Sequence, residues 1–283
     1  MLAAAPLIEK ELEVWPGLLR LAAAGEGARD ALDMGMDMAR EISLTLMADA
    51  ELLAGGSAEI LPRGKAGRLA LEAYQTLRDA LPASEMPPPL AALPGAVCDT
   101  VLAAMRAGGR TVLVSVGDVM AVHQEAGEIL PLRTGLPPIL HEFCGALGAG
   151  LQGGVALGGS RSAMPTSGLA DLVAVQTRGA ALAGLVAAML ADAADVAGAV
   201  RLAGDLRDRL LAMAWRGRRA TGAAGLVEPE AVWQALSAAV RLASALRDKR
   251  LLRAAAMGLK GRGRTVGPVD GDRLLRFGVS EWR

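Results

Sequence analysis

The chain has 283 residues, of which 52% are hydrophobic and 2% aromatic, and its formal net charge is +0, from 30 basic and 30 acidic residues. This length allows one large domain or two smaller ones, and the core must be built from alanine, leucine, valine and methionine. The balance of charge excludes wholesale nucleic-acid binding, because neutralising phosphates requires a basic surplus.

The cysteines and the N-terminal region indicate in which cellular compartment the protein is expected. The two cysteines, Cys98 and Cys144, make no disulfide framework, and no Cys/His spacing is typical of a zinc site. Charged residues at 9–11 precede any long apolar region, unlike a secretory signal. The longest charge-free helical run, between residues 178 and 192, is shorter than the roughly 20 apolar residues that span a bilayer. We therefore expect a soluble cytoplasmic protein without a membrane partner.

Residues 7–54 are predicted to be mainly helical. Apolar side chains recur three or four positions apart from Ile8 to Leu19, and four apart from Met34 to Leu46, which is the spacing of amphipathic helices. The pair Pro16-Gly17 interrupts the first of these helices, because proline lacks a backbone donor. A further helix is expected over 67–81.

The centre of the chain predicts a helix followed by a strand. Small apolar residues over 97–107 favour a helix, and the β-branched run 111–116 indicates a strand buried on both faces. Gly117-Asp118 breaks this strand, and 119–123 is expected to continue it, with a short return strand at 129–132.

A glycine-rich segment, Gly145–Gly168, comes next and is predicted to be a loop. It leads to a second strand over 171–177 and a second small-residue helix over 180–190. This order predicts an α+β fold in which helices pack on a sheet.

The last third is predicted to be helical with a basic tail. Amphipathic patterns favour helices over 196–219 and 229–259, and the second begins with proline and acidic residues, as helix N-termini do. The tail beginning at Leu259 is rich in turn residues and either remains a tail or packs as a final strand.

Five motifs in this order resemble the ApbE-like superfamily, the fold of bacterial flavin transferases, and most of all a small branch of it. They are MPPPLAALPGAVCDTVLAAM, VLVSVGDVMAV, GGVALGGSRSAMPTSG, the pair Ala170-Asp171, and AALAGLVAAMLAD. The resemblance covers about a third of the chain. It implies a mixed sheet with packed helices in a core over 83–195, flanked by helical segments at 1–82 and 196–283 that complete one compact domain.

Flavin transferases of this family hold magnesium with an Asp and a Thr of the final helix, and the matching positions here are near Gly184 and Ala187. Neither residue supplies the oxygen that a hard cation needs. The branch often carries a His in its Gly/Ser/Thr loop, where this chain has Ala163 and Met164. We therefore expect neither a metal nor flavin transfer, and the sequence identifies no cofactor.

The candidate site is predicted where strand ends meet glycine-rich connections. Gly117 allows the backbone to approach a ligand, and Asp118 orients a donor group of that ligand; a simple turn is the equal alternative. Ser160, Arg161 and Ser162 offer hydroxyls and a guanidinium to an anionic group, unless the loop merely packs tightly. The resulting prediction is one cleft, with Asp118 and Asp171 as catalytic residues and Gly117, Ser160, Arg161 and Ser162 as ligand-binding residues.

His141 and Cys144 form a weaker candidate. Their spacing puts both side chains on one helix face, as a nucleophile and its base would require. A buried structural cysteine is the more common outcome of such a pattern.

Two functions remain open from the sequence. The first is an ApbE-like enzyme of coenzyme or small-molecule biosynthesis that binds a small anionic ligand containing a nucleotide, pterin or phosphate group. The second is a non-catalytic subunit or assembly factor of a larger complex. Alanine-, leucine- and methionine-rich helices and a near-zero net charge further predict a homo-oligomer or a protein partner.

Overall fold

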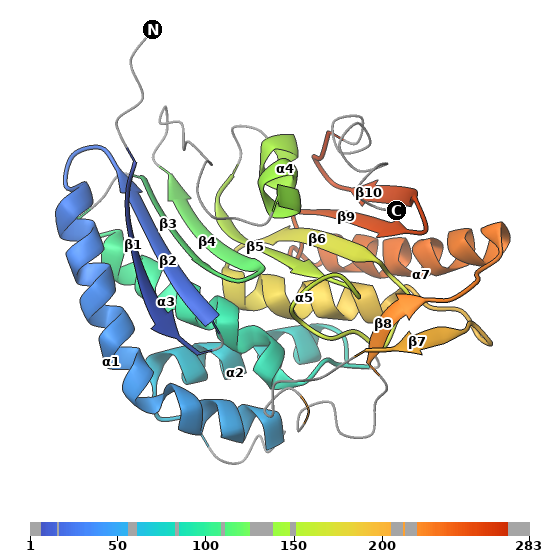
Figure 1. Cartoon of the computed structure of the whole chain (residues 1–283), viewed down its shortest axis with the longest axis horizontal. Helices are drawn as coiled ribbons and strands as arrows, with labels where there is room; N and C mark the ends of the chain where they lie inside the picture. The colour runs from blue at the N-terminus through green and yellow to red at the C-terminus, as the bar shows by residue number, and fades with distance from the viewer. Residues whose placement is uncertain are drawn as a thin grey trace, which may run out of the picture.

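A computed structural model of the chain describes residues 7–15, 17–55, 61–82, 85–108, 111–124, 138–147, 151–204, 212 and 220–270. These residues form an eight-stranded sheet in which all neighbouring strands are antiparallel. The α+β class is therefore confirmed, but the sheet is antiparallel and not mixed. Its strands, in spatial order, are β1 (Ile8–Val14), β2 (Gly17–Ala24), β3 (Thr111–Val116), β4 (Val119–Gln124), β5 (Gly153–Gly158), β6 (Leu172–Thr177), β9 (Ala254–Leu259) and β10 (Arg262–Val266) (Figure 1).

Helices cover one face of the sheet broadly (Figure 1). The small residues of the α3–α5 pair allow close packing: a Cβ on Gly95 would lie 2.1 Å from the Ala180 carbonyl oxygen. The helices and the short 3₁₀ turn of this layer are α1 (Ala28–Gly55), α2 (Lys65–Ala80), η1 (Pro89–Ala92), α3 (Leu93–Met105), α5 (Ala180–Ala193) and α7 (Pro229–Asp248).

The central strands of the sheet are apolar on both faces, whereas the outer strands β1 and β10 are mostly exposed. Successive residues of a strand point to opposite faces, so Val112 and Val114 of β3 join the large core under the helices, while Leu113 joins a smaller core on the other face. That smaller core includes Phe143 of α4 (Pro138–Leu147). All six residues of β3 and all six of β6 are buried, as their β-branched and apolar sequences predict.

The N-terminal prediction was wrong over residues 8–24. These residues form the antiparallel hairpin β1–β2, and β2 pairs in turn with β3. The helical spacing of apolar residues misled because Leu19, Leu21 and Ala23 also alternate, and that period of two puts them on the helix-covered face. The expected helices at 34–46 and 67–81 are confirmed as parts of α1 and α2.

The predicted continuation of β3 through 119–123 was also wrong in direction. Strand β4 returns antiparallel along β3, because Gly117-Asp118 makes a hairpin turn. The return strand expected at 129–132 lies outside the described residues.

The C-terminal helices are shorter than predicted. Of the expected helix over 196–219, residues 201–203 are the strand β7, which pairs with β8 (Thr221–Ala224), and 205–211 and 213–219 lie outside the described residues. Helix α7 ends at Asp248, and Ala254–Leu259 form β9, since pairing with β6 and burial outweigh their helical propensity.

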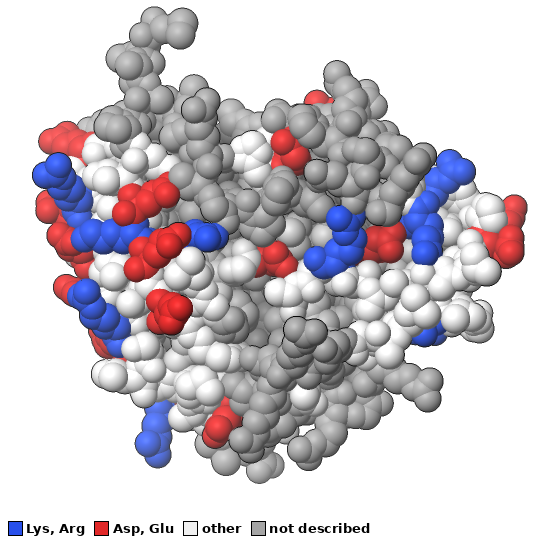
Figure 2. Space-filling model, viewed as in Figure 1, with Lys and Arg blue, Asp and Glu red and all other residues white. Residues whose placement is uncertain are grey.

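Within the described part of the tail, Arg262–Val266 form a strand, which was one of the two expected outcomes. Strand β10 pairs with β9 at the edge of the sheet. The strands thus come from all three of the segments expected from the sequence. Acidic and basic side chains are interspersed over the face seen in Figure 2. Within the described ranges, none of the helices has the length and apolarity that crossing a bilayer requires.

Candidate functional site

The Gly117-Asp118 turn joins β3 to β4 at one end of the sheet. Val116 pairs with Val119 across the turn, and Gly117 has φ +53°, a left-handed conformation that favours glycine in a tight hairpin. The backbone carbonyl of Asp118 accepts a hydrogen bond of 2.9 Å from the N–H of Leu157, which fixes the turn against the end of β5. The backbone of these residues therefore has a structural role, and any chemistry depends on the Asp118 side chain.

The carboxylate of Asp118 is held by the loop that follows β5. Its Oδ2 accepts a hydrogen bond of 2.5 Å from the backbone N–H of Ala163. Burial raises the pKa of Asp118 above its usual 3.8, and the hydrogen bond from Ala163 offsets part of that rise. A carboxyl group with a raised pKa exchanges a proton more readily near neutral pH, which suits general acid–base chemistry.

Asp118 lies on the wall of a cleft of about 270 Å³. Most of its lining is apolar, and its charged lining residues are Asp118 and Arg20. Arg20 also forms an ion pair with Glu11, with Nε 2.7 Å from Oε1. The other lining residues come from the β1–β2 hairpin, η1, the start of α3, the β3–β4 turn, the loop after β5, and α5: Trp15, Gly17, Leu18, Leu90, Ala91, Pro94, Val116, Gly117, Val119, Leu157, Ala163, Met164 and Gly184.

The loop residues predicted to bind the ligand lie beside this cleft and do not line it. The N–H groups of Ser160 and Arg161 donate to the carbonyls of Ala170 and Asp171, at 3.0 and 3.1 Å. The hydroxyl of Ser162 lies 3.0 Å from the Gly159 carbonyl oxygen and also contacts that of Met164. These bonds close the loop on itself, and the next two residues along the chain face the cleft.

Asp171 lies on the other side of the same loop. Its Oδ2 accepts a hydrogen bond of 2.6 Å from the backbone N–H of Lys260, in the turn between β9 and β10. Burial raises the pKa of Asp171, while the hydrogen bond and charge of Lys260 and the charge of Arg161 oppose that rise. Asp171 thus anchors a neighbouring hairpin and pairs electrostatically with Arg161.

The structure therefore brings the predicted residues together only in part. One loop contacts both Asp118 and Asp171, so all of them lie at the same end of β5 and β6. They divide into a cleft containing Gly117 and Asp118, and a charged group containing Arg161, Asp171 and Lys260.

The glycines of the segment predicted as a loop serve packing. Residues Gly153–Gly158 are the strand β5, contrary to the prediction. A Cβ on Gly154 would lie 2.1 Å from the backbone nitrogen of Ala180, and one on Gly158 would lie 2.6 Å from the Ala187 carbonyl oxygen. These glycines let α5 lie directly on the strand, which is a different task from cradling a phosphate.

A magnesium ion does not fit the place where the family resemblance would put it. Gly184 lines the cleft and has no side-chain oxygen, and a Cβ there would lie 2.6 Å from the Ala91 carbonyl oxygen. Ala187 packs against Gly158. Both helix positions are thus used for close packing, and hard cations need oxygen ligands. Among the described residues, no group of three His, Cys, Asp or Glu side chains could hold a metal ion.

The His141–Cys144 pair has the properties of a structural pair. Cys144 is buried in the smaller core, and burial raises the pKa of its thiol to about 12. A nucleophilic thiol needs the opposite shift, because the thiolate is the reactive form. His141 Nδ1 lies 3.5 Å from the carboxylate of Glu142.

Sequence reasoning missed the contribution of the β1–β2 hairpin to the cleft. Trp15 and Arg20 belong to a segment that was predicted to be helical. The available signal was the pair Pro16-Gly17, because proline and glycine mark hairpin turns. The segments on either side of this pair can also be read as strands, with apolar side chains at every second position.

Comparison with known proteins leaves the family open. Neither a scan against protein-family models nor a search of curated proteins gave a match to this chain.

Proposed function

We propose that this chain is an ApbE-like protein that binds a small anionic molecule in the Asp118 cleft, as an enzyme of coenzyme or small-molecule biosynthesis. The fold class and the order of motifs support this proposal. So does the position of Gly184 in the cleft lining, because that helix position is close to the one that the resemblance associates with the family's site.

The observation that carries the proposal is the half-buried carboxylate of Asp118. One of its oxygens accepts a hydrogen bond from the N–H of Ala163, and the described residues supply no hydrogen bond to the other oxygen. The raised pKa and the mainly apolar lining suit a group that takes or gives a proton on a bound ligand. Arg20 lies in the same lining and supplies a guanidinium to an anionic group.

The test is retention of a ligand by the purified protein, measured by native mass spectrometry, in the wild type and in Asp118→Asn. We expect a bound small molecule in the wild type, and a loss of affinity of about tenfold or more in the variant, since a charge-assisted hydrogen bond is removed. Asp37→Asn, at an exposed position of α1 far along the chain, is the matched control and should bind normally. Equal binding by both variants would contradict the proposal.

A second candidate function is a non-catalytic subunit of a larger assembly. Three large apolar side chains near the β7–β8 ribbon are exposed: Val200 at 59%, Leu202 at 57% and Leu226 at 97%. Exposed apolar side chains that lie near one another are typical of an association surface. Light scattering should then give a multimer or a complex for the wild type and a monomer for Leu202→Glu/Leu226→Glu. A wild-type monomer at all concentrations, without a co-purifying chain, would exclude this candidate.

A further inference from the structure

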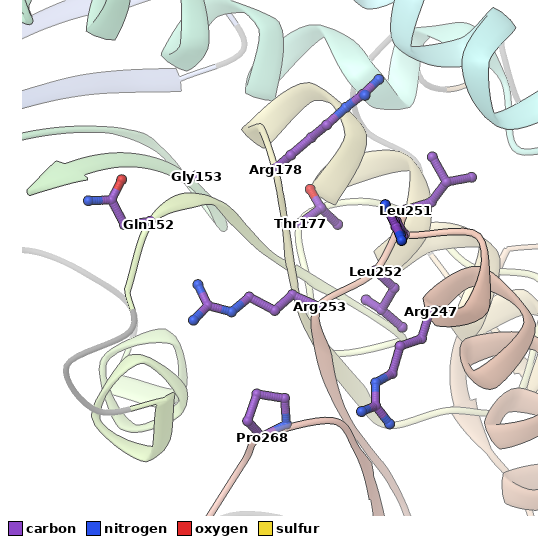
Figure 3. Close-up of a pocket in the computed structure, with 10 residues that line it drawn as sticks. Gln152, Gly153, Thr177, Arg178, Arg247, Leu251, Leu252, Arg253 and Pro268 are labelled. Carbon is purple, nitrogen blue, oxygen red and sulfur yellow. The ribbon is translucent and has the colours of Figure 1, made fainter.

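A second cavity lies at the opposite end of the sheet from the Asp118 cleft. Its volume is about 550 Å³, and four arginines line it: Arg178, Arg247, Arg250 and Arg253 (Figure 3). Gly153 lines this arginine pocket and Leu157 lines the Asp118 cleft, and along β5 these two residues are about 13 Å apart at 3.3 Å per residue.

The four arginines come from three separate segments. Arg178 follows β6 and precedes α5, Arg247 and Arg250 lie at the C-terminal end of α7, and Arg253 precedes β9. Cations at a helix C-terminus are favoured by the helix dipole, which accounts for the pair on α7. That effect does not account for Arg178 and Arg253, whose segments the sheet brings to the same cavity.

Arg250 occupies a position that ordinarily favours glycine. Its N–H donates to the Arg247 carbonyl and the N–H of Leu251 donates to the Leu246 carbonyl, both at 2.9 Å, so α7 ends in a Schellman motif. Arg250 has φ +59° at the left-handed position of that motif. An arginine there costs conformational free energy that glycine would avoid, and its side chain contributes to the pocket lining.

Three of the four arginines have no acidic partner among the described residues. These three are Arg178, Arg247 and Arg250. Asp99 lies at this end of α5, but its two oxygens accept from the N–H groups of Ala180 and Ala181.

The arginine side chains spread around the cavity and do not converge on one point. In Figure 3, Arg253 and Arg247 extend to different sides of the opening, and Arg178 points away from both. A single small ion could therefore contact only part of the set. Leu251, Leu252 and Pro268 add apolar surface to the wall.

We propose that this arginine pocket binds a small molecule that carries at least two phosphate groups. A phosphate group carries about two negative charges and matches the planar fork of a guanidinium, so two such groups suit a pocket lined by several arginines. The spread of the guanidinium groups fits separate phosphates better than one, and the apolar wall suits an organic part of the same ligand. The pocket is independent of the Asp118 cleft, and either proposal can fail alone.

The experiment is calorimetric titration with inorganic tripolyphosphate, pyrophosphate and orthophosphate at physiological ionic strength. We expect tripolyphosphate and pyrophosphate to bind at least about tenfold more tightly than orthophosphate. Arg250→Gly should weaken tripolyphosphate binding by about tenfold or more without lowering the melting temperature, because glycine suits the left-handed position. Arg178→Gln/Arg253→Gln should weaken it further.

One control completes the test. Arg68→Gln removes an exposed arginine from α2 and should leave tripolyphosphate binding unchanged. Absence of tripolyphosphate binding at millimolar concentration would overturn the proposal. So would orthophosphate binding as tight as that of tripolyphosphate, or an equal loss in Arg68→Gln, which would indicate general attraction to positive charge.

Discussion

Two half-buried carboxylates, Asp99 and Asp118, differ in how their oxygens are used. At the junction of α3 and α5, Asp99 accepts from the N–H groups of Ala180 and Ala181, both at 2.9 Å. At the β3–β4 turn, Asp118 accepts from Ala163 alone among the described residues. Burial raises the pKa of both groups.

The two carboxylates differ in the number of backbone N–H groups that donate to them. The first turn of a helix has N–H groups without partners in the helix, and Asp99 satisfies two of them for α5. Asp118 satisfies a single loop N–H and lies on a cleft wall. The raised pKa therefore does not by itself indicate a function. What distinguishes the helix-capping Asp99 from the candidate catalytic Asp118 is that both oxygens of Asp99 accept hydrogen bonds from the described residues, and only one oxygen of Asp118 does.

The largest effect is expected for Gly95→Ala at the α3–α5 junction. The new Cβ would lie 2.1 Å from the Ala180 carbonyl oxygen and 2.2 Å from its carbon, and backbone cannot move aside as a flexible side chain can. We expect a loss of about 3 kcal/mol in the free energy of unfolding, measured by urea denaturation. Gly55→Ala is the control, because a Cβ at Gly55 meets nothing within 4 Å. Equal stability of the two variants would show that the junction is not tightly packed.

Next in size is Asp99→Asn, compared with Asp118→Asn. An amide at residue 99 replaces one acceptor with a donor and leaves one helix N–H without a partner, which costs about 1–2 kcal/mol. At residue 118 the amide oxygen still accepts from Ala163, so thermal denaturation should show no loss. If both variants are destabilised equally, Asp118 has a structural role like that of Asp99.

Gly117 at the cleft is required for its backbone conformation, whereas Gly95 at the α3–α5 junction is required because a side chain would not fit there. A Cβ on Gly117 meets nothing within 4 Å, but its φ is +53°. Gly117→Ala should therefore cost about 1 kcal/mol, and Gly117→Asn less, because asparagine tolerates left-handed conformations. Chemical denaturation of the two variants measures this difference. Equal losses would contradict the conformational explanation.

The smallest expected effect is the contribution of Asp118 to the pH dependence of folding stability. Its folded-state pKa lies above the usual 3.8, so its contribution to stability is fully present below that pH and is lost as pH rises through the folded-state pKa. The wild type should therefore lose stability relative to Asp118→Asn as the pH rises from about 4 through the raised pKa. Melting temperatures at several pH values measure this. Parallel curves would show that burial does not shift the group.

The secondary structure was predictable in segments whose sequence pattern fits a strand or a helix but not both. The β-branched run of β3 and the apolar run of β6 have no competing helical period, and both strands are where the sequence places them. Ile8–Ala24 and Ala254–Leu259 carry patterns compatible with a helix, and pairing with β3 and β6 decides their conformation. That pairing is a tertiary effect, which no local pattern reports.

The position of the candidate cleft was predictable in part. Gly117-Asp118 marks a strand end, and the structure places Asp118 on a cleft wall. The arginine pocket escaped prediction because Arg178 and Arg253 are 75 positions apart and meet only through the pairing of β6 with β9. The ordering of Asp99 against α5, 81 positions away, has the same origin.

The two outer strands of the described sheet carry opposite charge. Strand β1, IEKELEV, has three glutamates against one lysine, and β10, RGRTV, has two arginines. Unpaired strand edges invite pairing with other chains, and like charge opposes it. Edge-to-edge contact of β1 with β1, or of β10 with β10, is therefore disfavoured, and only β1 against β10 is electrostatically permitted. Such contact joins two different edges, so repeated contacts of this kind at low ionic strength would form a ring where the rotation closes and a filament where it does not.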